Sequence, residues 1–359
     1  MTKRILYILL TAILLLIAGF ITAYSAWNGA NPEKTCARCH EINPSYDTWT
    51  RSAHREIACE ECHGTAMSNG FHSMKQKTGM LFSHMKEEKQ NRDIRMTEEQ
   101  IIETMHRCVN CHQEEYKKWQ SGGHSATYAQ IFLNDAHNSM EQPYWDCFRC
   151  HGMHYEGSIY DLIEPVSNTG PWKMKDGDKQ DDPVITCLAC HEIHSDNKVH
   201  KQPESMEDPD KIFYERKESS KLRNPKAGLY VRADKIYLRA DQLPKPAMYD
   251  GGREVRISND PIQRICVQCH APNYSHQAGT QDDRTLSGVH EGLSCTACHE
   301  THSNDASNAC TQCHPTIGNC GQDHMKMNTS YFNPESQNDI HHVKCSDCHD
   351  EAFLAAKQR

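Results

Sequence analysis

The sequence has few of the apolar side chains from which a protein core is usually built. Hydrophobic residues make up 37% of its 359 positions, and that share includes 19 cysteines and an apolar N-terminal segment. A conventional core over the rest of the chain would be thin. The sequence also lacks a net positive charge, since its formal charge is −9. This charge argues against nucleic acid and favours partners with basic docking faces.

Cysteine is almost absent outside one pattern. Eighteen of the 19 cysteines occur as Cys-x-x-Cys followed directly by His, a unit that appears nine times, and only Cys320 is left over. This unit is the c-type haem attachment signature. The predicted thioether cysteines are Cys36, Cys39, Cys59, Cys62, Cys108, Cys111, Cys147, Cys150, Cys187, Cys190, Cys266, Cys269, Cys295, Cys298, Cys310, Cys313, Cys345 and Cys348, and the predicted proximal iron ligands are His40, His63, His112, His151, His191, His270, His299, His314 and His349.

Disulfides and zinc sites use the same residue types. Neither explains a histidine directly after every second cysteine, whereas haem c needs two thiols for its vinyl groups and one histidine for its iron. Nine haems in 359 residues are about one per 40 residues, so the porphyrins themselves would form the core. We therefore predict a mainly α, haem-cored multihaem cytochrome c with much irregular loop. Cys320 is either a buried free thiol or paired with a partner chain.

Only one apolar run is long enough to cross a membrane. It extends over residues 5–24, carries no charge and follows Lys3 and Arg4. Its 20 residues match the hydrocarbon core, and the basic residues predict a cytoplasmic N-terminus with the haem domain on the periplasmic, extracytoplasmic side. The competing reading is a cleaved signal peptide ending near Ala23-Tyr24-Ser25, although the run is longer than a usual signal core.

The motif spacing predicts four segments. These are a membrane anchor (1–26), a five-haem region (27–200), a haem-free insert (201–262) and a four-haem region (263–359). The insert contains a small echo, YVRAD at Tyr230 and YLRAD at Tyr237, which predicts short strands. This hairpin either covers haem edges or forms an oligomer or partner contact. Helices are predicted after a capping box at residues 97–100 and over residues 74–92.

If every iron is held by two histidines, nine of the 15 histidines outside the motifs are needed as second axial ligands. Met is an alternative ligand that would raise the potential, although core packing explains the methionines near the motifs, Met153, Met325 and Met327. Two histidines on each iron give a low-potential carrier without an open position. His341 and His342 are adjacent, so at most one of them binds a given iron. His72, His84 and His106 are either ligands or solvent-facing residues. The candidates near motifs or in repeated settings are His54, His124, His154, His194, His290, His302 and His342.

The N-terminal part resembles the NapC/NirT family, which includes the small quinol-oxidising subunit of cytochrome c nitrite reductase. The resemblance covers about residues 1–155 and rests on CARCHEINPSYDTWTRSAHREIACEECHG, FHSMKQKTGMLFSHM, CVNCH and CFRCH. It implies one membrane helix, a four-haem domain and oxidation of menaquinol at the membrane surface. The second half resembles the multihaem cytochromes c in general.

The resemblance also assigns residues. It implies that His54 binds the iron of a different haem, that His124 and His154 are distal ligands, and that Lys75 lies beside the quinol pocket. For the pocket's carboxylate, Asp93 and Glu87 are candidates. The family's first haem takes a Met two residues after its attachment histidine, where this chain has Ile42. Ile cannot bind iron, so the first haem is either closed by a distant histidine or open.

These observations favour an electron-transfer protein that passes electrons from the quinol pool through nine haems c to a periplasmic or outer redox partner. It would be a quinol dehydrogenase if it also oxidises the quinol itself. It would act alone, as a homo-oligomer or as part of a larger respiratory complex. One alternative is a terminal reductase of a nitrogen or sulfur oxyanion at one open haem, although no motif is altered to Cys-x-x-Cys-Lys. The other is a polymerising cytochrome wire, against which the anchor argues.

Overall fold

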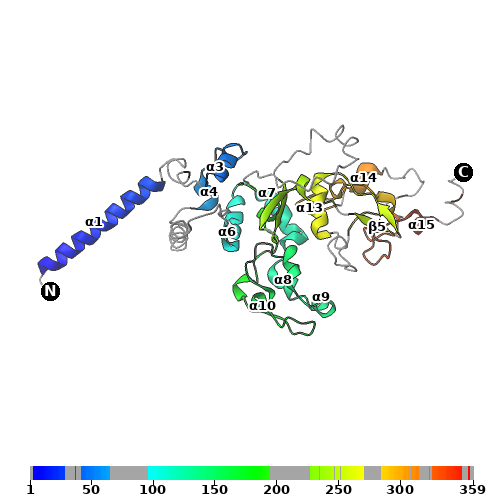
Figure 1. The fold of residues 1–359 in the computed structure, drawn as a ribbon, viewed down its shortest axis with the longest axis horizontal. Coiled ribbons are helices and arrows are strands. Elements are labelled where there is room, and N and C mark those ends of the chain that lie inside the picture. Colours follow the sequence, from blue (N-terminus) through cyan, green and yellow to red (C-terminus); the bar gives the residue numbers. More distant parts are fainter. Residues whose placement is uncertain are drawn as a thin grey trace. The chain divides into compact units, whose positions relative to one another are not determined.

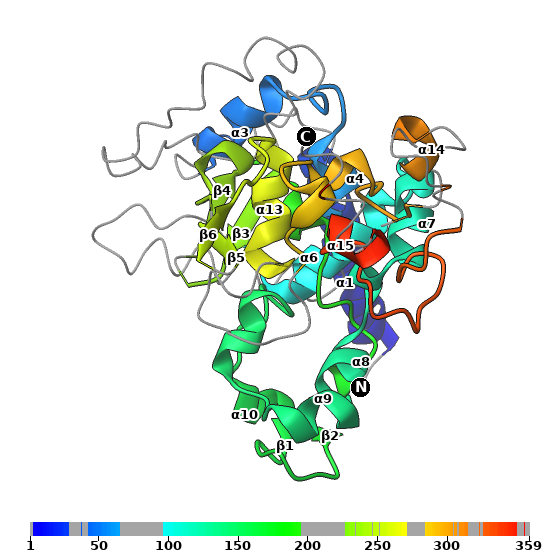
Figure 2. The same ribbon diagram turned by 90° about the vertical axis from the view of Figure 1, so that its right-hand side faces the viewer.

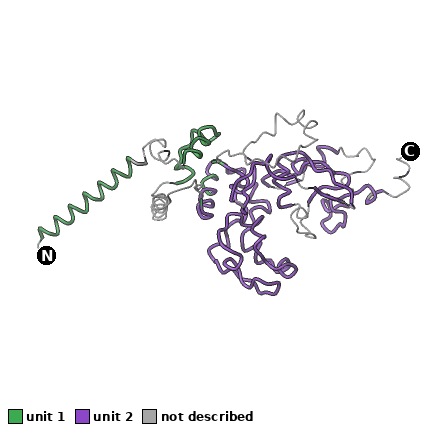
Figure 3. The backbone as a smooth tube through the Cα atoms, viewed as in Figure 1, with its two compact units in different colours: residues 1–96, 106–108, 193–198 green, residues 97–105, 109–192, 199–359 purple. Residues whose placement is uncertain are grey.

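The chain's structure, a computed structural model, describes residues 3–28, 37, 42–64, 96–194, 227–233, 235–245, 247–250, 252–270, 284–303, 305–306, 309–314, 323, 326–349 and 355 (Figure 1). It divides into two compact units (Figure 3). Unit 1 comprises residues 1–96, 106–108 and 193–198, and unit 2 comprises residues 97–105, 109–192 and 199–359. The units follow contacts in space, whereas the predicted segments follow motif spacing, so the two divisions need not coincide.

Short helices and turns dominate the described residues, as the sequence predicts. The α-helices are α1 (Lys3–Asn28), α3 (Asn43–Thr50), α4 (Cys59–His63), α6 (Glu98–Cys108), α7 (Gln113–Ser121), α8 (Tyr128–Phe132), α9 (Asp135–Met140), α10 (Ile159–Leu162), α11 (Cys187–Cys190), α13 (Pro261–His270), α14 (Ala309–Cys313) and α15 (Cys345–Cys348). The 3-10 turns are η1 (Gly123–Ser125), η2 (Trp145–Arg149), η3 (Gly177–Lys179), η4 (Ala240–Gln242), η6 (Gly288–His290) and η7 (Cys295–Ala297).

Three small antiparallel hairpins complete the described secondary structure. They pair β1 (Ile163–Glu164) with β2 (Lys173–Met174), β3 (Gly228–Val231) with β4 (Ile236–Arg239), and β5 (Met248–Asp250) with β6 (Arg253–Val255). The prediction of short strands at the YVRAD echo is therefore confirmed. Its two tyrosines, Tyr230 and Tyr237, are direct partners across the hairpin.

After Lys3 and Arg4, helix α1 carries no charge, and its apolar window within residues 3–26 is not buried in the structure. A helix that is apolar all round is normally buried, either in the core of a large protein or in a membrane. Among the described residues it is the helix long and apolar enough to cross a membrane, in agreement with the prediction from residues 5–24.

Five of the attachment motifs close a single helical turn of the same kind. In the motifs that end at His151, His191, His299, His314 and His349, the histidine N–H donates to the carbonyl of the first cysteine at 2.7–2.9 Å. This bond closes one turn of helix. Because residues three and four apart lie on the same side of a helix, the two cysteines and the histidine face one side together. The spacing of the motif thus produces its geometry locally.

Local signals also explain helix α6. The Thr97 N–H donates to the Gln100 side-chain oxygen at 2.9 Å, and the Gln100 N–H donates to the Thr97 hydroxyl at 3.5 Å. This confirms the predicted capping box. The apolar residues after it, Ile101, Ile102 and Met105, are buried. The second predicted helix, over residues 74–92, lies outside the described residues.

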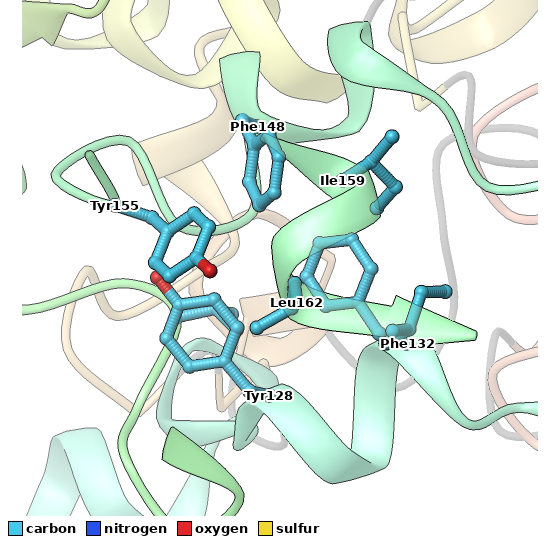
Figure 4. Packing of buried hydrophobic residues seen from close by; sticks show 8 residues of the cluster. Tyr128, Phe132, Phe148, Tyr155, Ile159 and Leu162 are labelled. Atoms are coloured by element: carbon cyan, nitrogen blue, oxygen red, sulfur yellow. The ribbon is translucent and has the colours of Figure 1, made fainter. Parts of the chain in front are cut away.

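The apolar core is divided into small clusters, which fits a chain whose cofactors supply the rest. The largest cluster packs Phe148, inside the fourth motif, against Tyr155, Tyr128 and Phe132 (Figure 4). The ring centroids of Phe148 and Tyr155 are 5.1 Å apart. Smaller clusters surround Leu229 and Val267. The apolar packing is therefore concentrated beside the attachment motifs.

Candidate haem-iron sites

Five motif histidines each lie opposite a second histidine, with the two ring centroids about 6 Å apart. In every pair one ring comes from an attachment motif and the other from outside the motifs. The pairs, with their centroid separations, are His63–His194 (5.9 Å), His191–His302 (6.0 Å), His270–His124 (6.1 Å), His299–His341 (6.0 Å) and His314–His290 (6.2 Å). The first pair lies within unit 1 and the other four lie within unit 2.

This gap has the size that one metal atom requires. A metal–imidazole bond is about 2.0–2.1 Å long, so two such bonds and two ring radii give a centroid separation of about 6 Å. The planes of the paired rings make angles between 6° and 71°, which rotation about a shared iron axis permits. The arrangement fits an iron between two imidazoles, beside the two cysteines that would anchor its porphyrin.

Burial favours the neutral form of six of these ten imidazoles. Burial lowers the pKa of His63 to about 4, with the neighbouring His194 and Arg107 as further causes. A neutral imidazole has a free ring lone pair and is the form that binds a metal. Burial is likewise the main cause that lowers the pKa values of His124, His191, His194, His290 and His341.

Hydrogen bonds orient several rings from outside the gap. His194 Nδ1 lies 3.0 Å from the Ser45 carbonyl oxygen, and His341 Nδ1 lies 3.0 Å from an Asp339 carboxylate oxygen. A partner on Nδ1 fixes the tautomer and leaves Nε2 for a metal. His342 Nδ1 has a similar contact, 3.2 Å from the Ser287 hydroxyl. These partners prepare the rings for axial ligation.

His154 is a further ring prepared in this way. Its Nε2 is buried and has no hydrogen-bond partner among the described residues. A hydrogen bond to the Leu188 backbone orients the ring, and burial lowers its pKa to about 4. A buried, unsatisfied ring nitrogen is costly unless something binds it, and an iron would satisfy it.

The motifs of unit 2 meet around helix α13, which carries the sixth motif. Arg149 of the fourth motif donates from Nη1 to the Gln268 carbonyl at 2.9 Å. The Cys269 thiol lies beside Cys150, and the Cys266 thiol beside Cys295, close enough for each pair to raise the pKa of Cys269 and Cys266. Thiols from the fourth, sixth and seventh motifs thus lie side by side, so their porphyrins would be close neighbours.

Asp260 fastens the start of α13 to the seventh motif. It is 1% exposed. Its carboxylate accepts from the Ile262 N–H at 2.9 Å, the Thr296 hydroxyl at 2.9 Å and the Ser294 hydroxyl. The first bond caps the helix, and the others come from the turn η7 that carries Cys295. One buried carboxylate therefore holds two attachment segments together.

Neither of the competing cysteine chemistries gains support. The described cysteines are thiols, and no disulfide joins any of them. In the same part of the chain, no group of three or more His, Cys, Asp or Glu side chains is placed to hold a metal ion. Within these residues, the paired histidines are the arrangement that suits a metal.

Some predicted site residues lie outside the described residues, and others are described but do not belong to the five pairs. Cys36, Cys39, His40, Lys75 and Cys320 belong to the first group. In the second group, His54 is half-buried and close enough to His194 to lower its pKa. His112 is exposed, and its Nδ1 lies 3.9 Å from a Glu115 carboxylate oxygen. The remaining members are half-buried: His151, His154, His342 and His349.

Sequence reasoning did not single out every residue that the structure brings to these sites. His341, and not the candidate His342, faces His299. Adjacent histidines point in different directions, so the choice between them depends on the fold. Tyr230, whose ring centroid lies 4.3 Å from that of His154, and Arg149 were also missed as site residues. For Tyr230 the repeated YVRAD phrase was a signal.

Comparison with protein families gave two matches. Residues 1–157 match the NapC/NirT cytochrome c family, N-terminal region, and residues 255–315 match cytochrome c7 and related cytochromes c. The first match contains motifs one to four, and the second contains motifs six to eight. No curated protein and no solved structure matches the chain significantly.

Proposed function

Because residues 1–157 are a NapC/NirT-type region and the chain is a multihaem c-type cytochrome, we propose that it carries electrons from menaquinol to a redox partner. Nine covalently bound haems c would relay the electrons. Each haem supplies an iron that gains and loses one electron, and the protein supplies attachment, ligands and orientation. The redox partner would be a periplasmic or outer protein on the extracytoplasmic side of the membrane.

The observation that carries this proposal is the set of five facing imidazole pairs. Two histidines per iron leave no open position for a substrate, so such haems carry electrons and do no chemistry on small molecules. We assign His194, His302, His124, His341 and His290 as the distal ligands of the second, fifth, sixth, seventh and eighth motifs, respectively. We further assign His54, His154 and His342 as distal ligands of haems on the motifs that lie outside the five pairs.

The membrane end of the proposal rests on the family and on α1. Helix α1 would anchor the chain, and Lys3 and Arg4 would keep its N-terminus in the cytoplasm. The first motif follows the anchor within a few residues, so menaquinol would deliver its electrons there, with Lys75 beside the quinol.

The first test is the spin state and number of the haems. We expect a mass that corresponds to nine haems per chain and a ferric spectrum that is almost entirely low-spin, in protein purified with its membrane segment. Cyanide should bind at most the first haem. A large high-spin fraction that binds nitrite or cyanide would instead support a reductase.

The second test is reduction by a menaquinol analogue. The wild-type protein should be reduced, and Lys75→Ala should slow its reduction at least several-fold. The matched control Lys117→Ala changes an exposed lysine in α7 and should react like wild type. Equal rates for all three proteins would contradict the quinol site, and no reduction of the wild type would contradict menaquinol as donor.

A further inference from the structure

The hairpin β3–β4 comes from the insert between the haem motifs, and it grips the segments of the fourth and fifth motifs. All of these residues belong to unit 2, where Figure 2 shows the hairpin beside α13. Ala227, just before β3, forms a β-bridge with His191 of the fifth motif. Leu229 packs with Met153 and Ala189 in one buried cluster. The hairpin therefore contributes to the interior around two attachment sites.

Tyr230 of β3 covers one face of the His154 ring. The two ring centroids are 4.3 Å apart and the planes make an angle of 27°, which is an offset stack. The ring's hydrogen bond is made to the Leu188 backbone, and because Nε2 has no hydrogen-bond partner among the described residues, this bond uses Nδ1. A stacked ring and a carbonyl together leave the imidazole little rotational freedom.

Two other side chains fix the hairpin in place. Arg232 donates from Nη2 to the Gly157 carbonyl at 3.0 Å and from Nη1 to the Tyr155 carbonyl. Its guanidinium also lies 4.8 Å from the centre of the Phe148 ring, a cation–π contact. The Tyr237 hydroxyl donates to the Cys190 carbonyl. The hairpin is thereby tied to the backbone directly after His154 and to the backbone of the fifth motif.

These contacts account for the YVRAD and YLRAD echo. Tyr230 and Tyr237 are register partners on adjacent strands, so they project from the same face of the hairpin. One of them meets the His154 ring and the other meets the fifth motif. An oligomer contact is not needed to explain either tyrosine.

We propose that the β3–β4 hairpin is a clamp on an iron ligand, with Tyr230 as the residue that positions the His154 imidazole. This inference rests on the proposed function in one respect, namely that His154 binds a haem iron. Partners outside the metal shell that orient a ligating histidine tune its bond to the metal. Removing Tyr230 frees the ring to rotate and weakens its hold on the iron.

The test compares four variants of the full-length holoprotein by electron paramagnetic resonance of the oxidised haems. His154→Ala removes the ligand and should convert about one haem in nine to a high-spin, cyanide-binding form. Tyr230→Ala should shift or partly lose the low-spin signal of that same haem. Tyr230→Phe keeps the ring and should restore the wild-type spectrum. The control Tyr160→Ala changes a tyrosine that is 65% exposed and should leave the spectrum unchanged.

The possible outcomes distinguish the positioning role of Tyr230 from the ligand role of His154. If His154→Ala leaves every haem low-spin, His154 is not a ligand and that part of the proposed function fails. If His154→Ala produces the high-spin haem but Tyr230→Ala matches wild type, the clamp is wrong and the ligand assignment stands. Tyr230→Leu keeps apolar packing in case alanine unfolds the hairpin. Loss of attached haem from both Tyr230→Ala and Tyr230→Leu, measured by mass, would show a role of Tyr230 in folding and would contradict a role in positioning His154.

Discussion

In two of its three occurrences, a histidine placed three residues after an attachment histidine lies opposite the histidine of a different motif. His194 follows His191 but faces His63, and His302 follows His299 but faces His191. The two axial ligands of an iron lie on opposite faces of the porphyrin. A side chain three residues beyond the proximal ligand leaves on the proximal side and cannot reach the other face. If these pairs each hold an iron, the repeated pattern would supply ligands to the haems of other motifs.

This geometry predicts the effect of removing one ring. His302→Ala should convert one haem to a high-spin, cyanide-binding form, because the iron held by His191 loses its second imidazole. Optical and electron paramagnetic resonance spectra of the purified protein would measure the change. The control His137→Ala removes an exposed histidine of α9 and should have no spectral effect. An unchanged spectrum for His302→Ala would contradict the pairing.

At this scale the sequence predicts the attachment residues and much of the ligand set but not the pairing. The two cysteines and the histidine that each haem requires lie within five consecutive residues. The candidate ligand His124, by contrast, meets His270 only after the chain has folded back over more than 100 residues. Proximity in sequence to a motif made His194 and His302 candidate ligands, and it carried no information on which motif histidine each would lie opposite.

Elements whose signals are local were predictable, and those that depend on tertiary contacts were not. The capping box before α6 and the β-branched and aromatic residues of β3 and β4 each act over a few residues. The junction around α13 depends on Asp260, Arg149 and Gln268, which are brought together by long-range folding. Nothing in their immediate neighbours distinguishes them from ordinary polar residues.

The junction at α13 makes Asp260 important for stability. Asp260→Ala should lower the free energy of unfolding by about 1–3 kcal/mol, because it leaves buried donors without an acceptor. Denaturant unfolding of the holoprotein followed by far-ultraviolet circular dichroism would measure this. Ser294→Ala removes one of the donors and leaves the helix cap intact, so its effect should be smaller. Equal stability of Asp260→Ala and wild type would show that the carboxylate does not hold the two segments together.

The cap of α10 gives a pH-dependent prediction. Hydrogen bonds from the Ser158 hydroxyl and N–H lower the pKa of Asp161. A carboxylate whose pKa is lower in the folded state stabilises that state above its unfolded pKa and loses this effect as pH falls through its folded pKa. Asp161→Asn should therefore lower the denaturation midpoint at pH 7 and match wild type at about pH 2–3.

The matched control for this prediction is Asp178→Asn, which changes an exposed carboxylate in the turn η3. At pH 7 it should differ from wild type less than Asp161→Asn does, and at low pH it should match wild type. If Asp161→Asn differed from wild type equally at pH 7 and at low pH, the capping interaction would not depend on the carboxylate charge.

At the scale of the whole molecule, paired histidines join regions that match different families. His124 lies within residues 1–157, and its partner His270 lies within residues 255–315. His302, in the second region, faces His191, which lies between the two. If each pair holds one iron, the haems of the two regions share ligands. The chain would then be one relay and not two cytochromes joined by a linker.

Such a chain should not fold without its haems. The described apolar clusters are small, and the largest has eight buried residues. Ordering each residue costs about 1–2 kcal/mol of conformational entropy, which clusters of this size cannot offset without covalent cofactors. Residues 27–359, expressed where haem is not attached, should therefore show a disordered circular dichroism spectrum and rapid proteolysis. The same segment carrying its haems should resist the protease. Cooperative unfolding of the haem-free chain would show that the polypeptide has a sufficient core of its own.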